Sequence, residues 1–281
     1  MKVRLLTALG ILVFGLPVLI FSQYMVYTVA LAILSGIASW ELLRALGLDK
    51  RWLVSLPTLL IAATIPFFTH PTFIVPERQK AYILVLATVF FGYLLYLALV
   101  SVFTRGATGF AEVSGVFMGV GYVVVSFTSL GLIRYMENGS YLFELVFIGA
   151  WVSDSMAYFT GRLLGKHKLC PELSPKKTVE GAIGGIVSDV IAFLLYGLII
   201  ETVYPNMQAN YLVLAILGVS LAVVSQLGDL FASLIKRERG IKDYSNILPG
   251  HGGILDRFDS CLPLSTVLLA VCIFFPPFVA G

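Results

Sequence analysis

Charged residues and cysteines are scarce in this chain of 281 residues. Asp, Glu, Lys and Arg together make up 12% of it, whereas roughly 25% is usual in a soluble domain. This shortage excludes an ordinary soluble fold, and the 58% of hydrophobic residues indicates an integral membrane protein. The three cysteines have no CxxC spacing, so we expect neither a disulfide framework nor a cysteine-based zinc site.

Apolar runs separated by short polar loops occupy most of the chain. Crossing a bilayer takes about 20 predominantly apolar residues, and nine runs approach that length. They lie at approximately residues 4–22, 24–43, 52–69, 81–103, 112–133, 142–163, 181–200, 211–235 and 260–279. We therefore predict an all-α, polytopic membrane protein with about nine transmembrane helices, the first of them retained as a helix rather than cleaved as a signal peptide.

The basic residues fall mainly in alternate loops. If the amino terminus is cytoplasmic, all but three of the 19 Lys and Arg residues lie on the cytoplasmic side; the exceptions are Arg78, Lys80 and Arg134. Because cytoplasmic loops carry the excess of positive charge, the pattern predicts a cytoplasmic amino terminus and an external carboxyl terminus.

The stretch of residues 233–259, between the eighth and ninth runs, combines cations, glycines and carboxylates. Gly250, Gly252 and Gly253 let backbone N–H groups approach an anion without a Cβ in the way. The basic side chains that can neutralise phosphate oxygens are Lys236, Arg237, Arg239, Lys242 and Arg257. Together these features predict a phosphate-binding loop.

Three carboxylates in or beside this stretch suit a metal ion. Asp256 and Asp259 lie three residues apart, which places them on one face if the chain is helical there. Asp229 lies inside the eighth run, where an acid usually faces a wet cavity or has a partner. Carboxylate oxygens are ligands that Mg²⁺ prefers, alongside water and substrate phosphates. The alternatives are helix capping for Asp256 or Asp259 and a structural ion pair for Asp229.

A second basic loop, at residues 164–180, is the other half of the predicted anion site. Ser174 or Thr178 is expected to cap the seventh helix, with Pro175 at a first helical position. Lys176 and Lys177 then fall in the first turn, where exposed N–H groups and lysines together favour a bound phosphate. The alternative is that these are ordinary positive-inside lysines.

Asp154 is a further acid inside a predicted span. Tyr158 follows one helical turn later and Arg162 two turns later. Asp154 is expected either to orient nucleotide hydroxyls or a lysine of the facing loop, or to be a structural partner of Arg162.

The informative features all lie after residue 150. We therefore predict that residues 1–140 form scaffold, lipid-facing wall or dimer surface, which leaves a homodimer open. Residues 141–281 are predicted to form the catalytic half, with cytoplasmic loops at 164–180 and 236–258.

Residues 233–259, preceded by Gln226, Gly228 and Asp229, closely resemble the signature of phosphatidate cytidylyltransferases, also called CDP-diacylglycerol synthases. Residues 174–181 and 154–162 are also similar to that family. The resemblance implies Mg²⁺-dependent transfer of CMP from CTP to phosphatidate, giving CDP-diacylglycerol and pyrophosphate in phospholipid biosynthesis. It implies a protein of the cell (inner) membrane with its site facing the cytoplasm, and no nucleic-acid partner.

The residue patterns and this resemblance together give the predicted site. The metal ligands are Asp229, Asp256 and Asp259, which with Lys236 are the catalytic residues, and a second cation of unknown identity has room beside the substrates. The substrate-binding residues are Asp154, Lys177, Thr178, Glu180, Ser233, Arg237, Lys242, Asn246, His251, Gly252, Gly253 and Arg257.

Two other functions are compatible with parts of the sequence. A CTP-dependent lipid kinase would share a nucleotide cradle. A cation-coupled membrane transporter would use Asp154, Asp189 and Asp229 as an intramembrane ion path, although it leaves the glycine-rich basic loop without a role.

Overall fold

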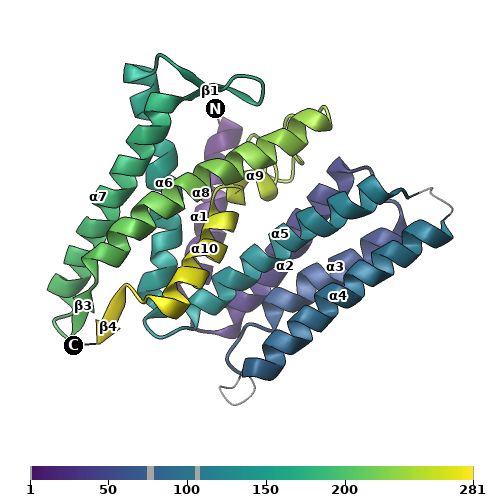
Figure 1. Ribbon diagram of the computed structural model, residues 1–281, viewed down its shortest axis with the longest axis horizontal. Helices are drawn as coiled ribbons and strands as arrows, with labels where there is room; N and C mark the ends of the chain where they lie inside the picture. Colours follow the sequence, from purple (N-terminus) through teal and green to yellow (C-terminus); the bar gives the residue numbers. More distant parts are fainter. Residues whose placement is uncertain (1, 75–78, 105–107, 281) are drawn as a thin grey trace. The chain divides into compact units, whose positions relative to one another are not determined.

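Figure 1 shows the fold in a computed structural model, which describes residues 2–74, 79–104 and 108–280. Arg78 and Arg105, on which the predicted orientation partly rests, lie outside the described residues. Within them the chain forms ten helices and four short strands. The helices are α1 (Lys2–Ile20), α2 (Met25–Ala45), α3 (Trp52–Phe67), α4 (Gln79–Phe103), α5 (Phe110–Arg134), α6 (Gly139–Leu164), α7 (Val179–Val203), α8 (Tyr211–Glu238), α9 (Leu255–Phe258) and α10 (Cys261–Phe274). The strands are β1 (Lys168–Cys170), β2 (Ser174–Thr178), β3 (Met207–Ala209) and β4 (Phe278–Ala280).

Most of these helices are apolar and long. Among the described residues, α2, α4, α5, α6, α7 and α8 are long and apolar enough to cross a membrane, while α3 and α10 are shorter apolar helices. The prediction of a mostly helical integral membrane protein is therefore confirmed. The count of nine spans and the orientation stay predictions.

The strands are an addition to the predicted all-α fold. β1 pairs antiparallel with β2, and β3 pairs antiparallel with β4. Residues 174–178, expected in part as the first turn of a helix, are extended instead. Pro175 disfavours a helical conformation at the residue before it, and pairing with β1 gives this segment backbone partners. Thr178 is the N-cap of α7, as one of the two predicted alternatives stated, because its Oγ1 accepts the Gly181 N–H at 3.1 Å.

The chain divides into two compact units. The first unit comprises Met1–Tyr135 and Arg239–Arg257, and the second comprises Met136–Glu238 and Phe258–Gly281. The loop at residues 239–257 therefore belongs with the amino-terminal helices.

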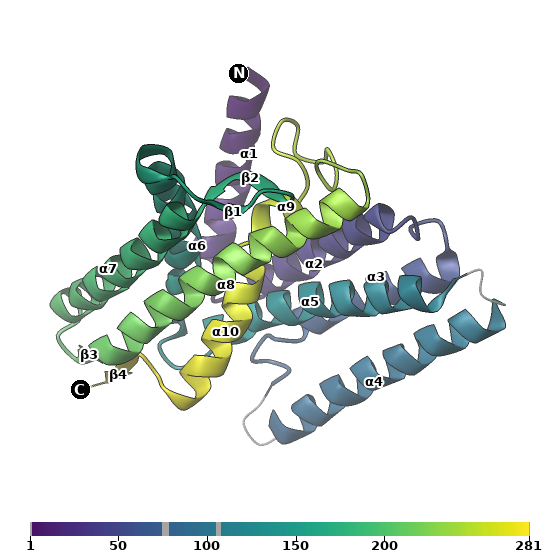
Figure 2. The same cartoon turned by 45° about the horizontal axis from the view of Figure 1, so that its top comes forward.

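In the first unit, α2 packs against α3 and α5, and α4 packs against α5 (Figure 2). Buried Leu42 and Leu43 of α2 contribute to its core. Gly119 of α5 allows the helix to lie directly against the Leu42 side chain. Tyr27 of α2 donates its hydroxyl to the Leu130 carbonyl of α5 at 3.3 Å.

In the second unit, α7 packs against α6 and α8, which also contact each other, and α10 contacts α8 and α6. The β1–β2 hairpin lies at one end of α6 and α7, and the β3–β4 pair lies at the other end of α7 (Figure 1). Glycines permit the closest helix contacts: Gly181 faces the Ala157 carbonyl of α6, and Gly218 of α8 faces the backbone of α7 at Val190. These contacts fix where the polar ends of the three helices meet.

We predict that Gly218→Ala destabilises the protein. The added Cβ would lie 2.7 Å from the Val190 Cα and 2.9 Å from its nitrogen, and backbone atoms cannot rotate away, so we expect a loss of about 1–3 kcal/mol in unfolding free energy. The matched control is Gly92→Ala in α4, where the Cβ would meet nothing within 4 Å and helix propensity should give a gain of about 0.5–1 kcal/mol. Thermal unfolding in detergent measures both. Equal effects of the two substitutions would contradict the α7–α8 contact.

Candidate functional site

Lys177, on the β1–β2 hairpin of the second unit, forms an ion pair with Asp229 of α8. Its Nζ lies 2.6 Å from Asp229 Oδ2, and the two side chains are 23% and 29% exposed. The hairpin register, with Lys168 opposite Thr178 and Cys170 opposite Ser174, holds this segment extended just before α7 begins. The loop lysine and the intramembrane acid are thus brought together. This contact agrees with the alternative of an ion pair for Asp229, and the metal site stays a prediction.

The same end of α8 carries further predicted residues. Asp229, Ser233 and Lys236 recur at helical spacing and are partly exposed, and Arg237 is exposed. Gly228 allows α8 to lie against the Asp259 carbonyl and Pro263, at the start of α10. This close approach places the beginning of α10 beside the polar end of α8.

Two more acids belong to this part of the second unit. Asp154 Oδ2 on α6 accepts a hydrogen bond from the Ser260 hydroxyl at 3.0 Å. Asp259 Oδ1 accepts the Ser260 N–H at 2.9 Å. The charges of Asp229 and Lys177 both act on the Asp154 carboxylate. Asp154, Asp229 and Asp259 are therefore one interacting set, and we call them the acidic set.

The acidic set brings three carboxylates together beside two lysines, Lys177 and Lys236. Burial raises the pKa of Asp259 to about 7, and the negative charges of Asp229 and Asp154 act in the same direction, while Lys236 opposes them. Carboxylates that resist ionising together favour a bound cation or a shared proton. The set can thus attract a cation.

The acidic set fits magnesium only if water and substrate supply most of the ligands of the ion. In the described part of the chain, no group of three or more His, Cys, Asp or Glu side chains is placed to hold a metal ion. Mg²⁺ is commonly bound through one or two carboxylates, with water and substrate phosphates completing its shell. The donor chemistry therefore fits an ion that arrives with a phosphorylated substrate.

Glu180, a predicted substrate-binding residue, and Arg162, an alternative partner of Asp154, form contacts with other residues. Glu180 accepts the backbone N–H of His167 and lies 2.6 Å from His167 Nδ1, which ties the start of α7 to the hairpin. Arg162 donates to the Tyr158 hydroxyl at 3.2 Å, and the Asp154 bond described above is made by Ser260. The alternative in which Asp154 serves as the structural partner of Arg162 receives no support from these contacts.

The loop at residues 239–257 of the first unit is folded around Asp256. Asp256 Oδ2 accepts the N–H groups of Tyr244 at 2.8 Å and of Gly253 at 3.0 Å. Leu248 donates its N–H to the Gly252 carbonyl, and Gly252 has the left-handed φ of 84° that a glycine adopts without strain. The N–H of Gly253 is thus directed at a carboxylate of the chain itself.

A second acid, Glu41 of α2, also holds this loop. Glu41 is fully buried and accepts the N–H groups of Ile254 at 2.9 Å and Leu255 at 2.8 Å, together with the Ser245 hydroxyl. Sequence reasoning missed it. The available signal was a lone acid within an apolar run, which marks a candidate functional residue.

The other predicted residues of the loop vary in exposure. Lys242, Asn246 and Arg257 are exposed, and Gly252 is buried. His251 is partly exposed, and its Nδ1 has no hydrogen-bond partner among the described residues. The loop therefore combines exposed polar side chains with a buried segment at residues 252–256.

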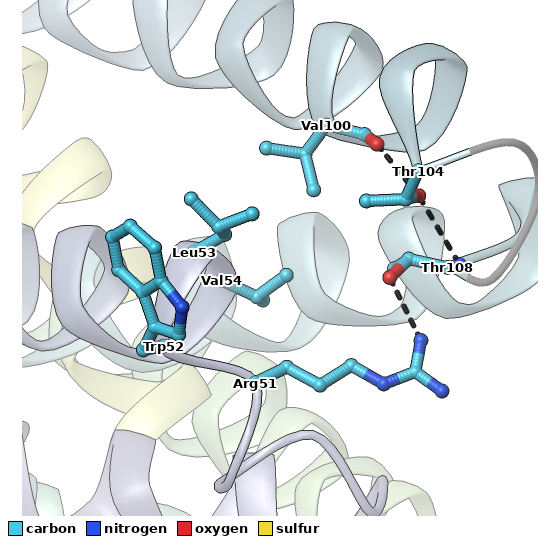
Figure 3. Close-up of a pocket in the computed structure, with 7 residues that line it drawn as sticks. All are labelled: Arg51, Trp52, Leu53, Val54, Val100, Thr104 and Thr108. Carbon is cyan, nitrogen blue, oxygen red and sulfur yellow. Dashed lines mark hydrogen bonds between the residues drawn. The ribbon is translucent and has the colours of Figure 1, made fainter.

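A pocket of 240 Å³ in the first unit contains none of the predicted site residues. Figure 3 shows its lining, in which Arg51 donates to Thr108 Oγ1 at 2.7 Å and Thr104 donates to the Val100 carbonyl at 2.7 Å. The remaining lining residues are Trp52, Leu53 and Val54. We assign it no role.

Comparison with known proteins gives one consistent result. The model of the cytidylyltransferase family matches residues 2–275. The chain is 36% identical over 282 residues to the phosphatidate cytidylyltransferase of Bacillus subtilis (strain 168), covering 96% of this chain and 98% of the relative. It is 36% identical over 274 residues to that of Staphylococcus aureus (strain COL) and 34% identical over 277 residues to that of Staphylococcus haemolyticus (strain JCSC1435), each covering 96% of this chain and 99% of the relative.

We predict that Lys177→Met lowers stability more than Lys176→Met. Lys176 is exposed, whereas Lys177 offsets the charge of Asp229, so its loss should cost about 1–3 kcal/mol, less than the roughly 3–5 kcal/mol of a fully buried pair. The double variant Lys177→Met/Asp229→Asn should recover part of the loss, since the uncompensated charge is gone. Thermal unfolding in detergent provides the measurement. Additive effects in the double variant would show that the pair is not coupled.

Proposed function

This chain belongs to the cytidylyltransferase family, and we propose that it is a phosphatidate cytidylyltransferase, transferring CMP from CTP to phosphatidate with release of pyrophosphate. The coarser function, a CTP-using nucleotidyltransferase of a membrane, follows from the family. The observation that carries the proposed site is the Lys177–Asp229 pair beside Asp154 and Asp259 in one unit. The substrate assignment is supported by similarity to relatives of that name over nearly the whole chain.

The lipid phosphate is proposed to act as the nucleophile. A phosphate monoester has a second pKa of about 6 and is mostly a dianion at neutral pH. Its oxygen forms a bond to the α-phosphorus of CTP while the bond from that phosphorus to the bridging oxygen breaks, and pyrophosphate leaves. No general base is required, because the nucleophile is already ionised.

The basic residues are proposed to offset the charge of two anionic substrates. Lys177 and Lys236 flank the acidic set, and Arg237 and Lys242 are exposed to reach phosphates. A Lys ammonium has three N–H donors, so Lys177 can hold a phosphate oxygen while it remains beside Asp229. Catalysis would then rest on positioning and charge neutralisation.

The proposed metal ligands are Asp229 and Asp259 of the second unit. Asp256, the third ligand predicted from the sequence, belongs to the first unit, where its Oδ2 accepts loop N–H groups. Magnesium, when bound, would supply Lewis-acid stabilisation of charge on the transferring phosphoryl group. The acids that hold it must be ionised, and a cation beside Asp259 would favour its ionised form over the protonated form that burial favours.

The proposed site faces the cytoplasm at the inner membrane. CTP is a cytosolic solute and phosphatidate places its head group at the membrane interface, so the site must be reachable from both. The predicted clustering of basic loops on one face agrees with this location.

The reaction is predicted to need three components at once. Purified protein in detergent should release pyrophosphate from CTP only when phosphatidate and Mg²⁺ are both present, and EDTA should abolish the release. Label from the α-phosphate of CTP should enter the lipid. Label from the γ-phosphate in the lipid would instead identify a kinase, and solute flux through proteoliposomes without pyrophosphate release would identify a transporter.

Removal of the proposed ligands should stop turnover with the fold intact. We expect Asp229→Asn and Asp259→Asn each to lower kcat about 100-fold or more, measured per folded molecule on monodisperse protein, because Asp229→Asn also breaks the ion pair with Lys177. The control is Glu201→Gln, because Glu201 lies about 30 Å along α7 from Glu180 and bonds only to Ala209 and Tyr211 in the described part of the chain. Unchanged turnover in either Asp variant would refute the metal assignment. Asp256→Asn is less decisive, since Asp256 also holds the loop backbone.

A further inference from the structure

The carboxylate of Glu41 lies where a charge is costly. Glu41 is an acid of α2 with no exposed surface, and an ionised carboxylate out of water requires hydrogen bonds or a cation. Three donors meet it, and all three come from the loop at residues 239–257. Glu41 lies outside residues 233–259, but its carboxylate depends on hydrogen-bond donors from that stretch. The loop in turn depends on Glu41 as an acceptor.

The three donors join both ends of the glycine-rich turn. Ser245 donates its hydroxyl from the beginning of the turn, and Ile254 and Leu255 donate successive N–H groups from its end. Ser245 Oγ also accepts the Ile247 N–H at 3.2 Å. One side chain of α2 therefore spans the turn from residue 245 to residue 255 and fixes the distance between its ends.

Gly253 is a glycine because of Glu41. A Cβ at this position would lie 2.6 Å from the Glu41 carboxyl carbon, well inside van der Waals contact. Gly252 needs its left-handed φ of 84°, whereas Gly253 does not have a positive φ. The requirement at position 253 is therefore the close approach of the α2 carboxylate.

Three backbone donors at the end of this turn are already engaged by protein carboxylates. Gly253 donates to Asp256, and Ile254 and Leu255 donate to Glu41. These three N–H groups are therefore not available as a phosphate cradle, whereas the exposed side chains of the loop at residues 239–257 are accessible to an anionic substrate. Lys242, Asn246 and Arg257 are exposed.

We propose that Glu41 is a positioning residue for the proposed transfer reaction: it touches no substrate, but by clamping residues 245–255 it sets the position of the loop at residues 239–257, which carries Lys242, Asn246 and Arg257. Its effect on turnover rests on the proposed function, while the clamp itself does not. In this role a small displacement of the loop lowers kcat, because reacting groups must be held in place within a fraction of an ångström.

The test compares Glu41→Gln with Asp49→Asn, a neutralised acid of the first unit just after α2. Glutamine keeps one acceptor but turns an NH₂ group toward the loop donors, so amide hydrogen exchange at residues 254–255 should become about tenfold faster or more. Exchange in α5 should stay unchanged. We expect kcat per folded molecule to fall about 10- to 100-fold, with a smaller change in the KM for CTP, and Asp49→Asn to match the unsubstituted protein in all respects.

A second pair of variants tests the clamp without relying on glutamine. Gly253→Ala should disturb the loop because the new methyl group meets Glu41, and this clash vanishes in Glu41→Ala. The double variant Glu41→Ala/Gly253→Ala should therefore exchange its loop amides no faster, and turn over no more slowly, than Glu41→Ala alone. Multiplied effects of the two substitutions would overturn the proposed contact.

The outcomes separate this inference from the proposed function. Loop exchange unchanged in Glu41→Gln overturns the clamp, whatever the activity. Faster loop exchange with undiminished kcat overturns the positioning role. If the unsubstituted protein releases no pyrophosphate under any condition, the proposed function fails, while hydrogen exchange still decides whether Glu41 holds the loop.

Discussion

An ionised acid among apolar helices needs hydrogen-bond donors or a cation, and this requirement is met at Glu41 and Asp256 in the first unit and at Asp229 in the second. In the first unit, Glu41 and Asp256 receive backbone N–H groups and a hydroxyl, which converts a glycine-rich stretch into a defined turn. In the second unit, Asp229 receives an ammonium group. The first arrangement is complete within the protein, whereas the acidic set of the second brings three carboxylates together beside two lysines. A self-contained cluster suits a structural role, and a cluster of carboxylates beside lysines suits cation and substrate binding.

Glycines occur at several close contacts near these polar groups, because a Cβ at these positions would clash with the neighbouring element. Gly181 lets α7 meet the backbone of α6, Gly228 lets α8 meet the start of α10, and Gly253 makes room for Glu41. Because interiors are close-packed, each contact determines the position of the nearby polar groups to within small limits. The accuracy of the site thus depends on residues that have no chemistry of their own.

The sequence sufficed for features that depend on local pattern. Hydrophobic run length identifies the membrane helices, and the chemistry of Thr178 identifies a helix cap. The partner of Lys177 was within reach of sequence reasoning, since an intramembrane acid needs a cation. The extended β1–β2 hairpin was not, because two strands of three and five residues carry too little periodicity.

Long-range partners lie beyond such reasoning for a physical reason. Glu41 and its donors are separated by 204 to 214 residues, and Asp154 and Ser260 by 106. A glycine motif indicates that another group approaches the backbone closely. It does not tell whether that group is a substrate phosphate or a carboxylate of another helix. Only the packing of α2 against its neighbours answers this for Gly253.

The hairpin that carries Lys177 also offers a means of observing it. Cys170 on β1 is partly exposed, whereas Cys261 and Cys272 are buried in α10. A maleimide spin label or fluorophore should therefore attach selectively at Cys170, whose register partner Ser174 lies on the same short strand as Lys177. The unsubstituted chain thus provides its own spectroscopic handle on the proposed nucleotide-binding loop, at a residue assigned no part in the chemistry.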